Sequence, residues 1–150
     1  MTEPSRELSP ANASDIEMAA ILSSATTIAV VGLSDKPDRD SYRVAAYLQE
    51  HGYRIVPVNP AAAEILGERS YADLGSIPAE IHLDVVDIFR KPEFIAPVVD
   101  AALARGAGAV WMQLGLVHNE AAGKARAAGL AVVMDRCIKV EHARLIASQR

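Results

Sequence analysis

The stretch TIAVVGLSDKPDRDSYRVAAYL, residues 27–48, decides the fold of this chain. It starts as an apolar strand ending at Gly32, passes through a short polar loop, and then takes up helical spacing with Val44, Tyr47 and Leu48. Many α/β proteins hold phosphate at such a junction, because the amino end of the helix offers unpaired N–H groups and a positive dipole. A single glycine stands where dinucleotide-binding loops carry three. The stretch therefore predicts a phosphorylated ligand held by an atypical loop.

The alternation of strand and helix continues along the chain. Apolar runs predict five strands, at residues 27–32, 53–60, 81–89, 108–115 and 130–135. Amphipathic segments before, between and after them predict helices, at residues 14–24, 41–52, 91–106, 119–129 and 137–148. Strands that are apolar at nearly every position belong to parallel sheets covered on both faces. We therefore predict an α/β protein with a Rossmann-like, doubly wound five-stranded parallel sheet in a single three-layer domain, with strand order 3-2-1-4-5.

Local signals place the helix ends. Ser14 and Glu17 form the pattern of a capping box, and Asn119 is the expected cap of its helix. Pro92 suits the first position of a helix. Residues 61–65 are expected to form one helical turn within an otherwise irregular connection.

Length and composition narrow the class of protein. A chain of 150 residues that is 51% apolar is most simply one domain with a sizeable core. We predict a leader over residues 1–13 and a ligand-binding domain over 14–150. The net charge of -4 argues against a general nucleic-acid binder. One cysteine, no signal peptide and no membrane-length apolar run predict a cytoplasmic protein.

The end of the second strand restricts the choice of nucleotide. NAD-binding domains usually place a carboxylate there to hold the ribose diol. This chain has Asn59 and Pro60, and the next carboxylate is Glu64. Ordinary NAD is therefore disfavoured. Coenzyme A (CoA) and NADP, which both carry an extra phosphate on the ribose, remain open.

Six segments in order resemble the small, stand-alone CoA-binding proteins. The segments are VVGLSDKPDRDSYRVAAYL, GYRIVPVNP, GERSYADLGSIP, VDIFRKPE, VWMQLGL and MDRCIKVEHARL. The resemblance covers residues 15–146. It implies a fold similar to the CoA-binding domain of the succinyl-CoA synthetase alpha subunit, with CoA bound across the carboxyl ends of the strands.

The resemblance also implies roles for particular residues. Those expected to hold the phosphates are Gly32, Leu33 and Ser34, through their backbone, with Lys36, Arg39 and Ser41. Those expected to flank the nucleotide are Val58, Asn59 and Pro60, with Ile88, Phe89 and Arg90 on the adenine side. Gln113 is expected near the pantetheine arm. Leu33 stands where many relatives carry alanine, a modest departure because the contact there is mainly through the backbone.

Candidate catalytic groups are few. Cys137 follows a strand and begins a helix beside Arg136 and Lys139, a setting typical of reactive thiols, although lone cysteines are more often small buried residues. A disulfide between this thiol and that of CoA is the specific form of the hypothesis. The four histidines, at positions 51, 82, 118 and 142, show no metal-ligand spacing.

Two aspartates, Asp84 and Asp87, lie in the predicted strand at residues 81–89. Asp84 and Asp87 are three residues apart and are expected to face opposite sides rather than to form a catalytic pair, with Asp87 capping a loop. Trp111 is expected in the core. No acid, base or nucleophile is placed well enough to assign a reaction, and the phosphorylated histidine of the synthetase belongs to a domain this chain lacks.

The sequence thus favours binding of CoA or an acyl-CoA, with CoA as the only cofactor and no nucleic acid, metal or membrane partner. Two alternatives remain open at this point. One is a small NADP-dependent oxidoreductase, and the other is an interaction protein with a vestigial nucleotide pocket.

Overall fold

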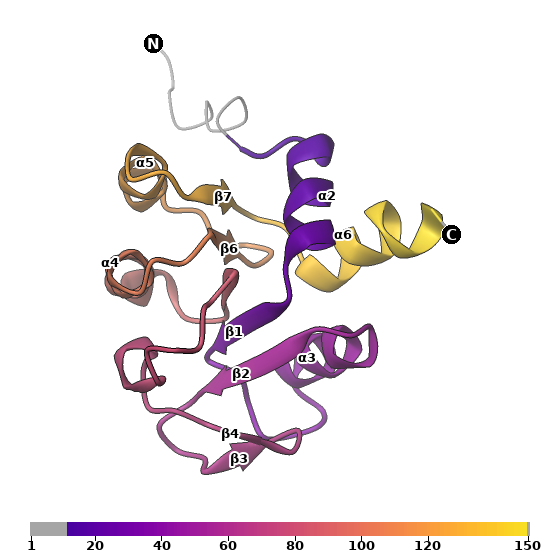
Figure 1. Cartoon of the computed structure of the whole chain (residues 1–150), viewed down its shortest axis with the longest axis vertical. Helices are drawn as coiled ribbons and strands as arrows, with labels where there is room; N and C mark the ends of the chain where they lie inside the picture. The colour runs from indigo at the N-terminus through magenta and orange to yellow at the C-terminus, as the bar shows by residue number, and fades with distance from the viewer. Residues whose placement is uncertain (1–11, 150) are drawn as a thin grey trace.

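The computed structural model describes residues 12–149 of the chain. Its centre is a parallel sheet in the order β2-β1-β5-β6-β7 (Figure 1). The strands are β1 (Thr27–Val31), β2 (Arg54–Val58), β5 (Val85–Ile88), β6 (Ala109–Met112) and β7 (Ala131–Val133). All four strand pairs are parallel. The predicted Rossmann-like α/β sheet of five parallel strands is confirmed.

The predicted strand order is wrong. The third parallel strand, β5, pairs with β1 in the register Val31↔Ile88, so the order by sequence is 2-1-3-4-5. The connection after β2 explains the difference. It folds into a small hairpin of β3 (Glu64–Ile65) and β4 (Glu68–Arg69) and then bridges the outer edge of β2 through Val58↔Tyr71. That edge is therefore occupied, and β5 crosses to the other side of β1.

The same hairpin overturns the helical turn expected at residues 61–65. Asn59 makes the turn instead, because its side-chain oxygen accepts the N–H of Ala61 and ends the strand. The chain then enters β3 directly.

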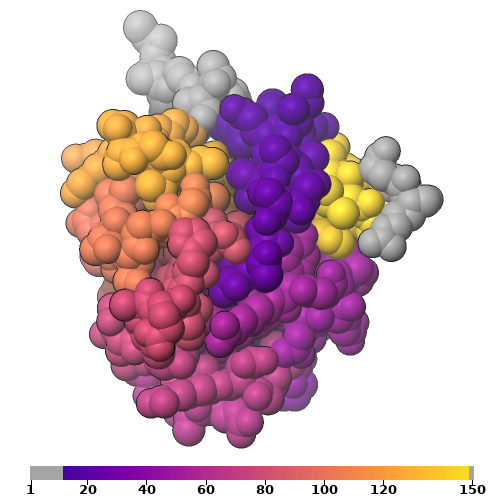
Figure 2. Space-filling model, viewed as in Figure 1, coloured from indigo at the N-terminus to yellow at the C-terminus, as the bar shows by residue number. Residues whose placement is uncertain are grey.

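Helices cover both faces of the sheet, which confirms the three layers. Three of them pack on one face, namely α2 (Asp15–Ser24), α3 (Asp40–Glu50) and α6 (Ile138–Leu145). The other face carries α4 (Ile95–Ala104) and α5 (Asn119–Ala127). Three short 3-10 turns complete the described chain, at η2 (Leu74–Ser76), η3 (Pro92–Phe94) and η4 (Ala147–Gln149). Figure 2 shows α2, in indigo, lying beside the yellow α6 at the surface.

Two of the three predicted helix-start signals are confirmed. The capping box is present, since Ser14 accepts the N–H of Glu17 and Glu17 accepts that of Ser14. Pro92 begins η3. The cap of α5 is His118 rather than Asn119, because its Nδ1 accepts the N–H of Ala121. Arg39 occupies the cap position of α3 without a side-chain bond.

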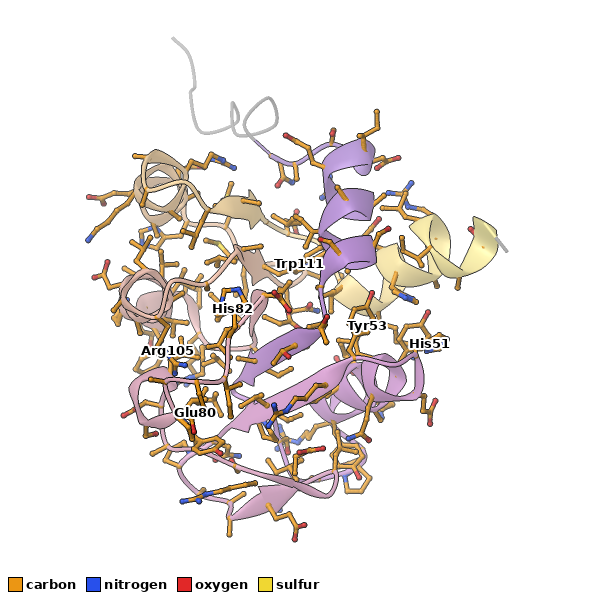
Figure 3. All side chains as sticks on the ribbon, viewed as in Figure 1. His51, Tyr53, Glu80, His82, Arg105 and Trp111 are labelled. Atoms are coloured by element: carbon orange, nitrogen blue, oxygen red, sulfur yellow. The ribbon has the colours of Figure 1, made fainter. Side chains whose placement is uncertain are left out.

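Long-range polar contacts hold the layers together. The guanidinium of Arg105, at the end of α4, donates to the carbonyl oxygens of Leu74, Ile77, Pro78 and Ile81 at 2.7 to 3.2 Å (Figure 3). This one side chain fixes the irregular connection that leads into β5. Trp111 is fully buried in β6, as expected.

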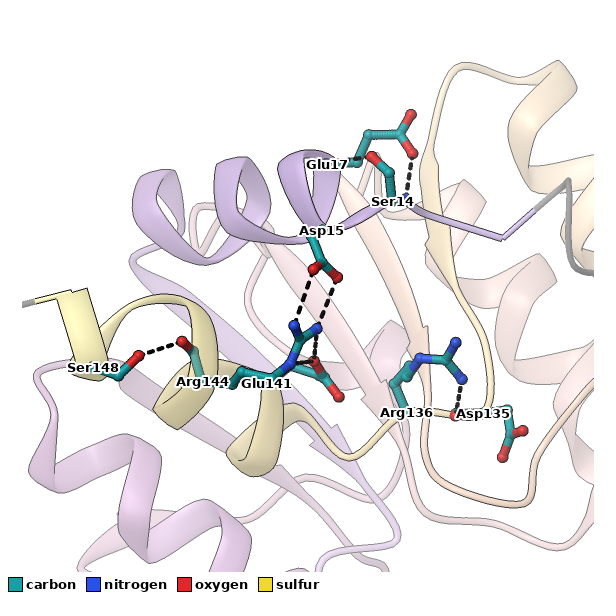
Figure 4. Close-up of polar contacts among 8 residues, drawn as sticks. All are labelled: Ser14, Asp15, Glu17, Asp135, Arg136, Glu141, Arg144 and Ser148. Atoms are coloured by element: carbon teal, nitrogen blue, oxygen red, sulfur yellow. Dashed lines mark hydrogen bonds and ion pairs between the residues drawn. The ribbon is translucent and has the colours of Figure 1, made fainter.

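The beginning and end of the described chain are also tied down. Asp15 accepts two hydrogen bonds from Arg144, which also bonds Glu141, so α2 is clasped to α6 (Figure 4). Asn12 pairs through its side-chain amide with both the N–H and the carbonyl of Met134, just beyond β7. Residues 1–11 of the predicted leader lie outside the described residues. No helix among the described residues is long and apolar enough to cross a membrane.

Candidate functional site

The carboxyl ends of the five strands meet at one edge of the sheet, and two cavities lie along that edge. Their volumes are about 490 Å³ and about 730 Å³, and we call them the first and second cavity. Both are lined by Phe89, Arg90 and Lys91, which follow β5 directly. The two cavities therefore adjoin at the end of β5. In a sheet of this order, ligands bind beside the strand where the order reverses, and that strand is β1 next to β5.

Gly32 directly follows β1 and lines the first cavity. Because it has no side chain, the backbone of Phe89 can approach it closely. Its φ is +87°, and a Cβ placed there would lie 2.2 Å from the carbonyl oxygen of Phe89. Its N–H donates to the carbonyl of Val58 at the end of β2. Only glycine allows this conformation and this approach together. The junction thus brings the ends of three strands into contact.

Hydrogen bonds between near neighbours in the sequence shape the loop after Gly32. The N–H of Ser34 donates to the hydroxyl of Ser41, and the N–H of Lys36 donates to the hydroxyl of Ser34. Ser41 is buried, so its hydroxyl acts inside the loop rather than as a helix cap. Asn59 donates to the carbonyl of Leu33, which ties the loop to the end of β2. The loop is therefore fixed at both ends.

The structure brings most of the residues predicted for the site together. Six of them line the first cavity, namely Gly32, Val58, Asn59, Pro60, Phe89 and Arg90. Gln113 lines the second. The side chains of Leu33 and Ile88 are fully buried in the core, on opposite faces of the sheet. Lys36 and Arg39 are exposed on the loop and line neither cavity.

Sequence reasoning missed several residues of the first cavity. Phe94 and Ala72 line it although neither was predicted there, and Lys91, which follows a strand but was not assigned to the site, lines it as well. The guanidinium of Arg90 lies over the ring of Phe94, at 4.0 Å from the centroid, and this contact fixes the direction of Arg90. Pro92 was the available signal, because a helix that begins there carries Phe94 back toward the strand end.

The second cavity is larger and holds more charged groups. Arg43 and Lys139 line it together with Arg90 and Lys91, and Asp40 is its one carboxylate. Arg43 is bonded to Asp40 and to the carbonyl of Asp38. Apolar side chains, among them Val44 and Leu116, form part of the wall. Such a cavity suits a ligand with anionic and apolar parts.

Gln113 lies on the floor of the second cavity and is almost fully buried, with 5% of its surface exposed. Its side-chain oxygen accepts the N–H of Ile138 at the start of α6. Its amide nitrogen donates to no described residue, and it is not among the polar atoms shut off from solvent. The cavity therefore contains an unused hydrogen-bond donor beside Cys137.

Asp87 does not cap a loop, contrary to the sequence expectation. It is fully buried in β5, between Val30 and Trp111 of the neighbouring strands, and neither carboxylate oxygen has a partner among the described residues. Burial raises the pKa of this carboxyl well above its usual range. Asp84, in contrast, accepts the N–H groups of Thr26 and Thr27. The two carboxylates form no pair.

Three of the four histidines make structural contacts within the fold, and the fourth, His82, lies 3.4 Å from a carboxylate oxygen of Asp84. His118 caps α5, and His142 bonds the hydroxyl of Tyr47. His51 ends α3, where its ring packs on that of Tyr47. Within residues 12–149 no group of three or more potential ligands could hold a metal ion.

The fold and the family match together define the class of this protein. A parallel sheet with cavities at its carboxyl edge defines a Rossmann-like domain. The chain belongs to the CoA binding domain family, whose match covers residues 26–143. The resemblance to small CoA-binding proteins is thereby confirmed.

Three relatives illustrate the family. Uncharacterized protein YneT of Bacillus subtilis is 43% identical over 132 residues, 88% of this chain and 96% of the relative. A hypothetical protein from Pyrococcus horikoshii OT3 is 40% identical with a TM-score of 0.85, and the match covers 97% of this chain and 98% of that one. Cell-free ID.343 from Thermus thermophilus is 40% identical with a TM-score of 0.83, over 89% of this chain and 100% of that one.

Proposed function

We propose that this protein binds coenzyme A, free or acylated, across the carboxyl edge of its sheet. The observation that carries the proposal is the shared border of the two cavities. CoA is itself a molecule of two parts, a nucleotide and a pantetheine arm, joined by a diphosphate. A ligand of that form fits two adjoining cavities with cations at the border, and Arg90 and Lys91 supply those cations.

The first cavity is the proposed nucleotide site. Val58, Asn59 and Pro60 flank it at the end of β2, and Phe89 offers an aromatic wall at the end of β5. Asn59 stands where NAD-binding domains usually carry a carboxylate, and its side chain is already bonded to Leu33 and Ala61. A ribose bearing an extra phosphate meets no negative charge from this residue.

The diphosphate is assigned to the border of the cavities. The backbone of Gly32, Leu33 and Ser34 lies at the end of β1 beside Phe89 and Arg90. Lys36 and Arg39 project from the exposed part of the same loop and are proposed to contact phosphate oxygens from outside. Gln113, in the second cavity, is the proposed donor to an amide carbonyl of the pantetheine arm.

NADP is the ligand that best competes with this proposal, because it also carries a phosphate on the adenosine ribose. It would place a nicotinamide ring, rather than a thiol arm, in the second cavity. A vestigial pocket on an interaction protein would bind neither. Binding measurements with a single series of ligands therefore distinguish the three possibilities.

Thermal unfolding with CoA, dephospho-CoA, NADP and NAD, each at equal concentration, tests the proposal. Ligand at 100 times its dissociation constant adds about 2.7 kcal/mol of stability. We expect the largest rise in melting temperature with CoA, a smaller rise with dephospho-CoA and none with NAD. A larger rise with NADP than with CoA, or no rise with any ligand, contradicts the proposal.

A further inference from the structure

Cys137 is the only cysteine of the chain, and it is half-buried on the wall of the second cavity. It occupies the cap position of α6, four residues beyond the end of β7. The proposed CoA contacts explain neither its position nor its exposure to this cavity.

Two side chains of β6 and its extension fix the backbone on either side of this cysteine. The indole N–H of Trp111 donates to the carbonyl of Arg136 at 2.9 Å, and Gln113 accepts the N–H of Ile138 at 3.1 Å. Trp111 and Gln113 are two residues apart and share one face of the sheet. Cys137 is thus held over this face at the cavity, rather than on a loose surface loop.

A second, independent observation indicates that a polar ligand enters here. The Gln113 side chain is more than nine-tenths buried, yet its amide nitrogen has no partner among the described residues. Buried amides usually satisfy both of their polar ends. The pantetheine arm carries two amide groups and ends in a thiol, so a donor at Gln113 would fix the arm within reach of the cavity wall that includes Cys137.

The charges around the cavity match the remainder of the ligand. Arg90 and Lys91 lie at its border with the first cavity, and Lys139 lies two residues after Cys137. A CoA molecule whose diphosphate sits at that border directs its arm into the second cavity. The ligand and the cysteine therefore bring two sulfur atoms into the same space.

We propose that Cys137 exchanges disulfides with the thiol end of CoA, using CoA disulfide as the oxidised co-reactant. The inference rests on the proposed CoA function. The Cys137 thiolate attacks one sulfur of CoA disulfide, the bond between the two CoA sulfurs breaks, and a bond between Cys137 and one CoA forms. The second CoA leaves as a thiolate and takes up the proton that Cys137 lost. Cys137 is oxidised and one CoA is reduced, and an external thiol reverses the step.

Intact mass spectrometry of the reduced protein tests the inference directly. Equal concentrations of CoA disulfide and of glutathione disulfide are added in separate reactions, and the rate of adduct formation is measured for each. Because the chain has one cysteine, any adduct is assigned without digestion. We expect the CoA adduct to form at least about tenfold faster, since a bound reagent presents its sulfur at high effective concentration. Cys137→Ser should give no adduct.

A matched variant tests the role of Gln113. Gln113→Glu keeps an oxygen for the N–H of Ile138 but removes the amide donor. We expect it to reduce the preference for CoA disulfide over glutathione disulfide by about tenfold. Reaction of both reagents at equal rates in the wild type, which needs no variant to fold, overturns the inference.

Non-covalent binding separates this inference from the proposed function. CoA binding to Cys137→Ser is measured by calorimetry in the presence of reductant, with Cys137→Ala as the second variant if the first melts early. Binding without a preferred CoA adduct overturns the exchange and leaves the proposed function standing. If the wild type neither binds CoA nor reacts preferentially with CoA disulfide, both the exchange and the proposed function are overturned.

Discussion

The guanidinium of Arg90 lies 4.0 Å from the centroid of the Phe94 ring, so the cation at the border of the two cavities rests on an aromatic surface. The contact orders a long side chain before any ligand arrives, and this reduces the entropy lost on binding. Arg90 is therefore the cation whose removal should affect CoA binding most.

Arg90→Ala should weaken CoA binding by about 1.5–3 kcal/mol, the contribution of a hydrogen bond to a charged group. Added salt should weaken the wild type more than the variant, which has less charge to screen. Arg69→Ala is the matched control, because Arg69 also lies over an aromatic ring, that of Tyr71, but lines neither cavity. Calorimetry at low and high salt measures both variants. Equal affinities for Arg90→Ala and the wild type would remove Arg90 from the site.

Arg39→Ala tests whether the exposed cations of the loop after β1, Lys36 and Arg39, contribute as much to CoA binding as Arg90 and Lys91, which line both cavities. Arg39 is exposed and lines neither cavity, so we expect a loss of CoA affinity below about 1 kcal/mol, as for surface charge pairs. The same titration serves as the measurement. A loss as large as that of Arg90→Ala would mean that the loop closes over the phosphates when CoA binds.

Gly32→Ala should destabilise the fold even without ligand. The new Cβ meets the carbonyl oxygen of Phe89, which belongs to the backbone and cannot swing away. Gly52→Ala is the control, because Gly52 has a similar φ of +97° but open space around it. We expect a loss of about 1–2 kcal/mol from backbone strain at Gly52. At Gly32 the loss should exceed this by about 1–3 kcal/mol for overpacking. Urea unfolding compares the two, and equal losses would show that the strand ends separate easily.

Asp87→Asn should change how stability depends on pH. Burial raises the pKa of Asp87 in the folded state, so the folded protein retains a proton that the unfolded chain releases. The stability linked to Asp87 is therefore present below the unfolded pKa, near 3.9, and is lost as the pH rises toward the folded pKa. The variant should gain stability relative to the wild type from about pH 4 to neutral pH. Melting temperatures across that range check this, and a constant offset would contradict it.

Arg105→Lys should cost far more stability than Arg144→Lys. The four carbonyl oxygens that Arg105 satisfies lie in one irregular connection, and a lysine cannot reach all four. We expect a loss of about 2–4 kcal/mol at Arg105, since carbonyl groups lose their donor in a half-buried place. Arg144 pairs with Asp15 at the surface, where solvent screens the charges. Chemical unfolding of both variants is the test, and similar losses would mean that water replaces Arg105.

The sequence predicted the elements well because their signals are local. Each strand is a short apolar run and each helix has a stripe of apolar residues, so the five parallel strands and three layers followed. The strand order depended on whether the third parallel strand would pair with the outer edge of β2 or with the free edge of β1. That choice is set by the bridge between Val58 and Tyr71, which no local pattern reveals.

The candidate site likewise contains residues that the sequence could predict and residues that it could not. Gly32, Asn59 and Phe89 were found because each directly follows a strand, and strand ends meet at one edge. Ile88 was included because of the family resemblance, but alternation along β5 turns its side chain into the core. Lys139 and Arg43 reach the second cavity from within helices. Whether their side chains reach the cavity depends on how each helix is rotated about its own axis, and the sequence does not specify that rotation.

Each of the two outer strands of the sheet has part of its open edge covered by the chain itself. An open strand edge invites another chain to extend the sheet, which leads toward aggregation. Beyond β2 the segment after the hairpin pairs Tyr71 with Val58, and beyond β7 the carboxamide of Asn12 occupies the N–H and the carbonyl of Met134 as a foreign backbone would. Asn12→Ala leaves that second position open. We therefore expect Asn12→Ala to expose this edge to pairing with another chain, although the residue lines neither cavity.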